Sequence, residues 1–187
     1  MKIIIIGATG TLGKIVTHSL REHEIITVGR NIGDVIADIS IASSIENLYK
    51  KISNIDAVIC LAGDSITAPL PEMNEKKYLA GIEQKLLPQI NLVLSGMHFL
   101  NDNGSFTLIS GKMGEVPTKG SSGKALINGA LHSFVTAAAQ ELPRGIRLNI
   151  VSPSKVSDIA DEDLEKAYRK CIETSINGEI VRVGYTI

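Results

Sequence analysis

The chain has 187 residues, a formal net charge of −1 and two cysteines. The near-neutral charge gives no electrostatic reason to expect a nucleic acid or an anionic membrane as partner. No apolar stretch approaches the roughly 18 residues of a membrane span, and the N-terminal apolar run is too short for a signal-peptide core. Cys60 and Cys171 lie too far apart for a metal or redox motif. We therefore expect one cytoplasmic domain over residues 1–187, without a metal site.

An apolar strand, Lys2–Ile6, opens the chain and ends in three glycines, Gly7, Gly10 and Gly13. A helix over Leu12–Glu22 and a strand over Ile25–Val28 are predicted next, which completes a strand–helix–strand unit. Glycines at such a turn let the backbone approach a ligand, and the N-terminus of the helix attracts a pyrophosphate. The pattern predicts a dinucleotide site, the alternative being a glycine-rich turn without a ligand.

Strands and helices alternate through the rest of the chain. Further strands are predicted over Val35–Ile39, Ala57–Leu61, Phe106–Ser110, Arg147–Val151 and Ile180–Gly184. Helices are predicted over Ser43–Lys51, Asn74–Leu100, Ser121–Leu142 and Asp161–Thr174. Apolar strands between amphipathic helices are typical of a parallel sheet covered on both faces. We predict an α/β fold, a Rossmann-type, doubly wound three-layer sandwich.

The helix predicted over Ser121–Leu142 has a face of small residues, among them Gly123, Ala125, Gly129 and Ala130. Small residues permit close approach to another helix or to the sheet. We expect a homo-dimer or homo-tetramer through the long helices, the alternative being packing within one subunit.

Several motifs accompany the glycine turn Gly7-Ala8-Thr9-Gly10-Thr11-Leu12-Gly13. They are Asp38-Ile39, Cys60-Leu61-Ala62-Gly63, the segment Lys124–Gly129, the segment Arg147–Pro153 and, more loosely, Gly178–Val181. In this order and at these spacings they resemble the short-chain dehydrogenase/reductase superfamily over nearly the whole chain. The resemblance implies a mostly parallel sheet of about seven strands in the order 3-2-1-4-5-6-7.

The resemblance also implies roles at a cofactor. The turn from Gly7 to Gly13, with Thr9, Thr11 and Leu12, would bind the pyrophosphate. Asp38 would accept from the adenine amino group and Ile39 would lie against the ring, while Ala62 and Gly63 would pass beneath the adenine ribose. Lys124 would bind the nicotinamide ribose, and Pro153 and Ser154 would lie near the nicotinamide.

The end of the second strand indicates which dinucleotide is bound. A dehydrogenase that selects NAD usually has a carboxylate there, which bonds the ribose hydroxyls. This chain has Gly29-Arg30 and no carboxylate before Asp34. An arginine suits a 2′-phosphate, so we predict NADP(H) over NAD(H). The alternative is that Arg30 is a solvated surface residue.

The chain departs from the superfamily at its catalytic residues. The family uses a tyrosine hydroxyl as acid or base, four residues before the lysine that matches Lys124, and Gly120 stands there. The family's Ser-Ser pair, whose second serine is usually catalytic, falls on Ser110-Gly111, so strict alignment puts Gly111 at the site, and Ser110 is the candidate if the turn is shorter. The family's asparagine falls near Gln84 or Lys85, and we favour Lys85.

Two other features bear on the site. A substrate-covering segment before the last helix is missing, so we expect an open nicotinamide end. Ser110, Lys112, Lys119 and Lys124 could cluster there, and a lysine with a depressed pKa could then act as the acid. The histidines, His18, His23, His98 and His132, show no ligand spacing, and we expect them to be structural or exposed.

These observations predict an NADP(H)-dependent oxidoreductase that acts on a small carbonyl or alcohol by hydride transfer. A non-catalytic NADP(H)-sensing or regulatory protein is the alternative, because the catalytic tyrosine is absent. An epimerase or dehydratase of nucleotide sugars ranks last, because it needs a substrate domain that this chain is too short to contain.

Overall fold

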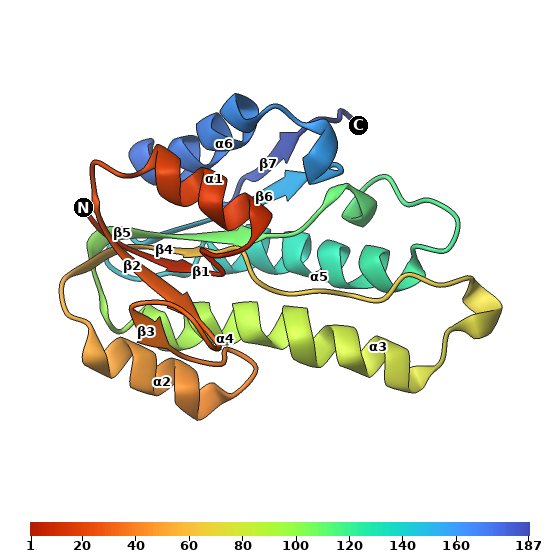
Figure 1. The fold of residues 1–187 in the computed structure, drawn as a ribbon, viewed down its shortest axis with the longest axis horizontal. Helices are drawn as coiled ribbons and strands as arrows, with labels where there is room; N and C mark the ends of the chain where they lie inside the picture. Colours follow the sequence, from red (N-terminus) through yellow and green to blue (C-terminus); the bar gives the residue numbers. More distant parts are fainter.

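A seven-stranded sheet runs through the computed structural model, which describes residues 1–187 (Figure 1). All paired strands are parallel, and their order is β3-β2-β1-β4-β5-β6-β7. The strands are β1 (Lys2–Ile6), β2 (Glu24–Gly29), β3 (Val35–Ile36), β4 (Ile55–Cys60), β5 (Leu100–Ile109), β6 (Arg147–Pro153) and β7 (Ile180–Val183). This confirms the predicted fold class and strand order.

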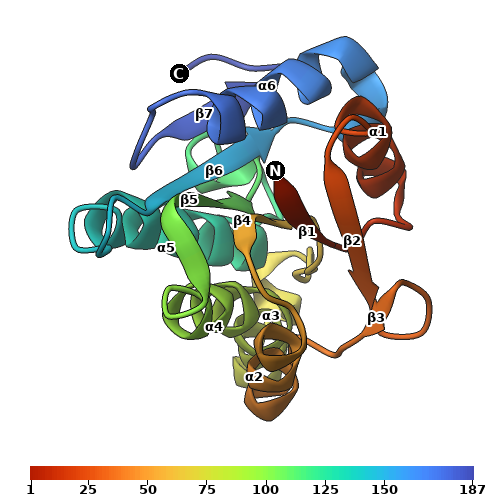
Figure 2. The ribbon, with the colours of Figure 1, turned by 90° about the vertical axis from the view of Figure 1, so that its left-hand side faces the viewer.

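Helices cover both faces of the sheet, as two perpendicular views show (Figures 1 and 2). One face carries α1 (Thr11–Ser19) and α6 (Asp161–Glu173). The other carries α2 (Ala42–Lys51), α3 (Glu75–Gly81), α4 (Leu87–Gly96) and α5 (Ser122–Ala138). None of these helices is long and apolar enough to cross a membrane.

The apolar run of β1 follows from this layering. Ile4 and Ile6 belong to the core beneath α2, α4 and α5, whereas Ile3 and Ile5 belong to the core beneath α1 and α6. Successive strand residues point to opposite faces, and here both faces are buried. A central strand of this sheet therefore has no polar alternation.

The predicted helix over Asn74–Leu100 is confirmed as one uninterrupted helical run that begins at Glu75, but its predicted end at Leu100 is wrong. The structure has α3, a π-helical segment Ile82–Leu86, and α4, which ends at Gly96. A Cβ at Gly96 would lie 2.5 Å from the Tyr49 hydroxyl oxygen, so this helix end is packed tightly on α2. A π-helical turn holds one extra residue and often marks a functional site.

Several predicted boundaries also differ. Strand β5 begins at Leu100 rather than Phe106, because Leu100 pairs with Ile55 beyond an irregularity in the ladder. Strand β3 stops at Ile36 rather than Ile39, since only Val35 and Ile36 pair with β2. Helix α1 ends at Ser19 rather than Glu22, and α5 ends at Ala138 rather than Leu142.

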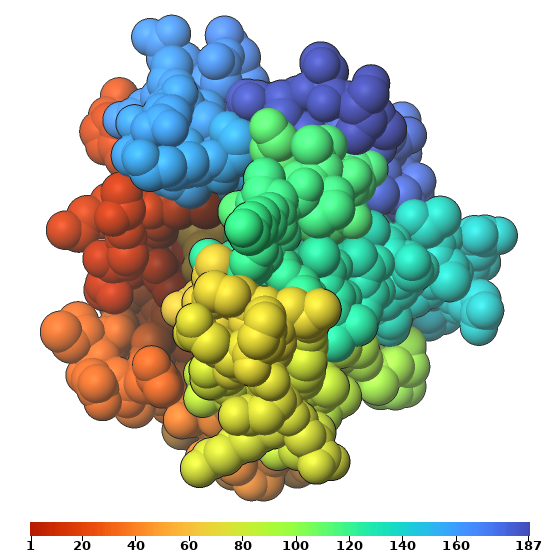
Figure 3. All heavy atoms as spheres, turned by 90° about the vertical axis from the view of Figure 1, so that its right-hand side faces the viewer, coloured from red at the N-terminus to blue at the C-terminus, as the bar shows by residue number.

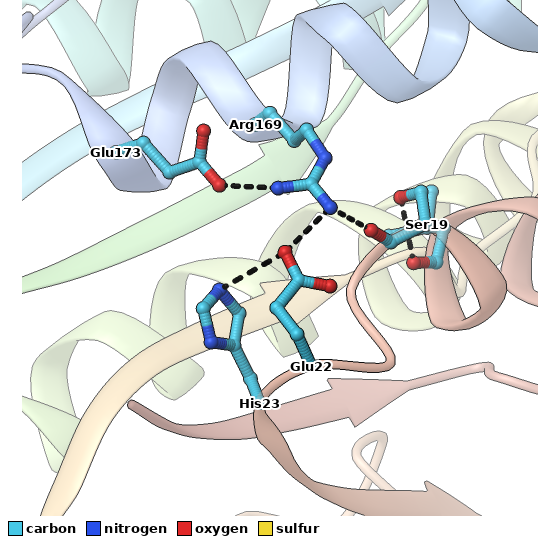
Figure 4. A network of polar contacts seen from close by, with 6 residues as sticks. Ser19, Glu22, His23, Arg169 and Glu173 are labelled. Atoms are coloured by element: carbon cyan, nitrogen blue, oxygen red, sulfur yellow. Dashed lines mark hydrogen bonds and ion pairs between the residues drawn. The ribbon is translucent and has the colours of Figure 1, made fainter.

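A polar network joins α6 to the end of α1 (Figure 4). The Arg169 guanidinium donates to Glu22, to Glu173 and to the Ser19 carbonyl oxygen. The Nε2 of His23 lies 3.8 Å from the Glu22 carboxylate. These contacts fix the position of α1, whose N-terminus points at the candidate site.

Candidate functional site

Two cavities meet at the carboxyl ends of the strands, where the strand order reverses between β1 and β4. Ligands of doubly wound sheets bind at this place. The first cavity, about 610 Å³, is bordered by the ends of β1 and β2. The second, about 900 Å³, is bordered by α1, α5 and the ends of β5 and β6, and both contain Gly63 and Asp64. Figure 3 shows a hollow between the N-terminal segments, in red and orange, and the yellow and green segments.

The glycine turn brings the start of α1 to these cavities. Gly7 has a φ of +84°, and Gly10 is the N-cap of α1. A Cβ at Gly13 would collide with the backbone of Gly7 and Ala8, so only glycine permits this close contact. Thr9 lines the first cavity, while Thr11 and Leu12 line the second. The first N–H groups of a helix lack partners within it, so they are donors for an anion here.

The first cavity contains the residues predicted for the adenosine half. It is lined by Gly7, Thr9, Arg30, Asp38, Ile39, Ala62 and Gly63 among others. Gly10 and Gly13 line neither cavity, and they act through the shape of the turn. Asp38 accepts from the Ser40 hydroxyl at 2.7 Å and from its backbone N–H at 2.9 Å, and these bonds lower the pKa of Asp38.

Two charged side chains, Arg30 and Asp34, lie between β2 and β3, and only Arg30 borders the first cavity. Arg30 is exposed, lines the first cavity and forms no ion pair. Asp34 accepts from the Thr27 backbone N–H at 2.8 Å and from its hydroxyl at 2.7 Å. The Asp34 carboxylate is therefore held against β2, and Arg30 is the charged group from this segment that borders the cavity.

Lys85 lies in the π-helical segment and lines the second cavity. It is 7% exposed. Its ammonium group donates to the Asn128 Oδ1 at 3.0 Å and to the Ser110 carbonyl oxygen at 3.3 Å. Burial lowers the pKa of Lys85 to about 8. Gln84, the other residue considered for this position, is exposed and lines the first cavity.

Ser110 follows β5 and also lines the second cavity. Its hydroxyl oxygen lies 2.7 Å from Nε2 of His132, on α5. His132 is 5% exposed, and burial lowers its pKa, so the imidazole is neutral near pH 7. The Ser110 hydroxyl donates to the Val151 carbonyl oxygen at 3.4 Å, and a neutral imidazole protonated on Nε2 donates to the same hydroxyl oxygen.

The tyrosine position is outside both cavities. Gly120 has a φ of +81°, and its carbonyl accepts from the Ala68 N–H. A larger residue would be strained at this backbone conformation. The tyrosines lie elsewhere: Tyr49 and Tyr168 are fully buried, Tyr78 contacts Ser122, and Tyr185 contacts Ser152 and Glu115. None of the four lines either cavity.

The suggested cluster of lysines forms only in part. Lys112 and Lys124 line the second cavity with Ser110, whereas Lys119 is exposed and lies outside it. Pro153 and Ser154 line the same cavity, and the short segment after them, with Val156 and Asp158, borders it in place of a longer lid.

Sequence reasoning missed Asn128 and His132 as members of the site. Lys124, Asn128 and His132 follow one another at four-residue intervals on α5, which brings them to one face of the helix. That polar stripe among small residues was a signal available in the sequence. Its meaning depended on β5 and the π-helical segment, whose place opposite α5 the sequence did not reveal.

The comparisons with known proteins agree with this architecture. A family model described as enoyl-(acyl carrier protein) reductase matches residues 15–184. The protein lin1944 from Listeria innocua is 39% identical, covering 98% of this chain and 99% of its own, with a TM-score of 0.93. No curated protein matches the chain.

Two more distant structures share the fold. A small-chain dehydrogenase in complex with NADPH is 21% identical, with a TM-score of 0.87 over 98% of this chain and 96% of that one. The enoyl-[acyl-carrier-protein] reductase (NADH) of Aquifex aeolicus VF5 is 19% identical, with the same TM-score and the same coverage.

Proposed function

The chain belongs to the short-chain dehydrogenase/reductase superfamily, and we propose that it is an NADP(H)-dependent oxidoreductase acting on a small carbonyl or alcohol. The observation that carries the proposal is the joined pair of cavities, which begins at Arg30 and ends at Lys85 and Ser110. One half suits the adenosine phosphate and the other suits the nicotinamide and a substrate.

The residues present fit a dinucleotide. At Gly13 a Cβ would collide with the backbone of Gly7, so the turn can form only with glycine there. This turn would present the N-terminus of α1 to the pyrophosphate. Asp38 and Ile39 would hold the adenine, Ala62 and Gly63 would lie beneath its ribose, and Lys124 would bind the nicotinamide ribose. When bound, the nicotinamide supplies a hydride. Ser110 would orient the substrate by donating a hydrogen bond to its oxygen, in place of the 3.4 Å bond to the Val151 carbonyl.

The preference for NADP(H) rests on Arg30. Its guanidinium has no carboxylate partner, and the Asp34 carboxylate that would repel a 2′-phosphate is bonded to Thr27. The related structures include one with NADPH and one described as an NADH enzyme, so the choice rests on this chain's own residues.

Arg30→Asp tests this preference. Loss of the charge-assisted bonds should weaken NADPH binding by about 1.5–3 kcal/mol, roughly 10- to 150-fold, with little loss for NADH. Fluorescence titration of both cofactors measures the two dissociation constants. Arg21→Asp, an exposed arginine outside both cavities, is the matched control. An unchanged preference for NADPH in Arg30→Asp would refute the assignment.

The second candidate function is NADP(H) sensing without catalysis, which the glycine at position 120 favours. Both functions require NADPH binding. Only the oxidoreductase should oxidise NADPH when offered a panel of quinones, aldehydes and ketones. Tight NADPH binding with no turnover across the panel would select the sensor.

A further inference from the structure

We propose that Lys85 is the acid and base of this site, giving the proton to the substrate oxygen in reduction and taking it back in oxidation. This inference rests on the proposed function. In the family a tyrosine is the acid or base, and Gly120 stands at its position in this chain. We assign that role to a lysine of the π-helical segment.

The position of Lys85 is built by several elements. The π-helical segment that contains it faces α5 and the end of β5. Gly63, with a φ of +126°, covers the lysine stem, and a Cβ at Gly63 would lie 2.8 Å from the Lys85 Cγ. The stem is therefore confined on this side, at a residue that lines the second cavity.

One N–H group of the Lys85 ammonium has no acceptor within the chain. Lysine offers three N–H groups. The Asn128 side chain and the Ser110 carbonyl accept two of them, and no acceptor in the chain takes the third. Because Ser110 also lines the cavity, its hydroxyl and the free N–H of Lys85 both suit a single oxygen of a bound substrate. A carbonyl oxygen that receives negative charge needs such donors.

The charges around Lys85 leave its proton transferable. Besides burial, Asp64 on the loop after β4 and Cys60 at the end of β4 raise the pKa of Lys85, and Lys124 on α5 lowers it. The neutral His132 lies on the same helix, beyond Ser110. Burial is the largest effect and brings the pKa down to about 8. An acid is most effective when its pKa lies near the working pH.

The step balances with groups already named. The carbonyl carbon receives the hydride of NADPH, which is oxidised to NADP⁺, and the C=O electron pair moves to the oxygen. That oxygen takes a proton from the Lys85 ammonium group and becomes the alcohol hydroxyl. The Lys85 amine then regains a proton from water. Oxidation of the alcohol is the reverse.

Lys85→Met tests the role by removing the proton and keeping the volume. We expect kcat for carbonyl reduction to fall by about 10²- to 10⁴-fold, with the NADPH dissociation constant unchanged. In the wild type, kcat/KM for reduction should fall as the pH rises past about 8, since only protonated Lys85 is an acid. Lys76→Met, an exposed lysine on α3, is the matched control and should keep both the rate and the pH profile.

A chemical rescue separates catalysis from structure. Lys85→Cys is treated with 2-bromoethylamine, which restores an amine of lower pKa because the sulfur withdraws electrons. Position 85 lines the second cavity, whereas Cys60 and Cys171 line neither cavity, and burial raises the pKa of each of these two thiols to about 12, so they should resist alkylation. Rate should return, with the descending limb of the pH profile moved to lower pH.

The outcomes distinguish this inference from the function on which it rests. A Lys85→Met protein that turns over at the wild-type rate, or a rescue that leaves the pH profile unmoved, overturns the role of Lys85 alone. A wild-type protein that binds NADPH and reduces nothing in the panel overturns the oxidoreductase, and the role of Lys85 with it.

Discussion

Lys85 is a buried cation without a carboxylate in ion-pair contact. Its ammonium group is held by an amide oxygen and a backbone carbonyl, which compensate only part of the lost hydration. Burial of the charge lowers the pKa of Lys85 for this reason. In the folded chain Lys85 releases its proton near pH 8, whereas lysine in an unfolded chain keeps the proton up to about pH 10.5. Residues under such strain from burial often have a functional role.

This residue should make stability depend on pH in a defined direction. Between about pH 8 and 10.5 the unfolded chain binds more protons at Lys85 than the folded chain. The free energy of unfolding of the wild type should therefore rise with pH relative to that of Lys85→Met. Urea unfolding of both proteins across this range measures the difference, with Lys76→Met expected to follow the wild type. If the difference in the free energy of unfolding between the two proteins did not change with pH, the lowered pKa of Lys85 would be contradicted.

At the scale of elements, Arg147 joins the start of β6 to the end of α6. Its guanidinium donates to the carbonyl oxygens of Cys171, Ile172 and Ile176. Cys171 and Ile172 lie in the last turn of α6, where carbonyls have no partner within the helix, and Ile176 follows the helix. One side chain thus terminates α6 and anchors it against the sheet.

Arg147→Met should leave the Cys171 and Ile172 carbonyls without a donor, whereas the Ile176 carbonyl keeps the Asn149 amide. We expect a loss of about 1–3 kcal/mol in the free energy of unfolding for each buried carbonyl that finds no water. Urea denaturation measures the loss, and Arg21→Met on the surface should cost far less. An Arg147→Met protein as stable as the wild type would show that solvent replaces the guanidinium.

At the scale of the whole molecule, α3, α4 and α5 lie in one helical layer (Figure 1), and each exposes apolar residues. Leu79, Leu87, Leu94 and Leu126 are between 44% and 50% exposed. Together with the small residues of α5 they offer a surface that a second copy could cover. We propose a homo-dimer or homo-tetramer formed through these helices, in which the same surface is used twice.

Light scattering after size exclusion should give a mass that is a multiple of 20.0 kDa. The double variant Leu87→Glu/Leu94→Glu should reduce it to the monomer, because two buried charges would face the partner. Ile41→Glu, an exposed isoleucine before α2, is the control and should leave the mass unchanged. A monomeric wild type would contradict this interface.

The sequence by itself determined the layers of the fold and the glycine turn into α1. Burial on both faces makes β1 apolar throughout, and a tight turn into α1 requires glycine at positions 7 and 13. Both requirements act within a few residues, so they leave a local pattern. The fold class and strand order followed from such patterns together with the resemblance to a known superfamily.

Tertiary structure alone decided which polar side chains meet beside the second cavity. Lys85 meets Asn128 across 43 residues of sequence, and Ser110 meets His132 across 22. The start of β5 likewise depended on Ile55, 45 residues earlier, where a polar segment hid the strand. No local periodicity encodes which distant side chains will pack together. The physical reason is that their partners are brought together by the sheet and by α5, after each segment has formed its own structure.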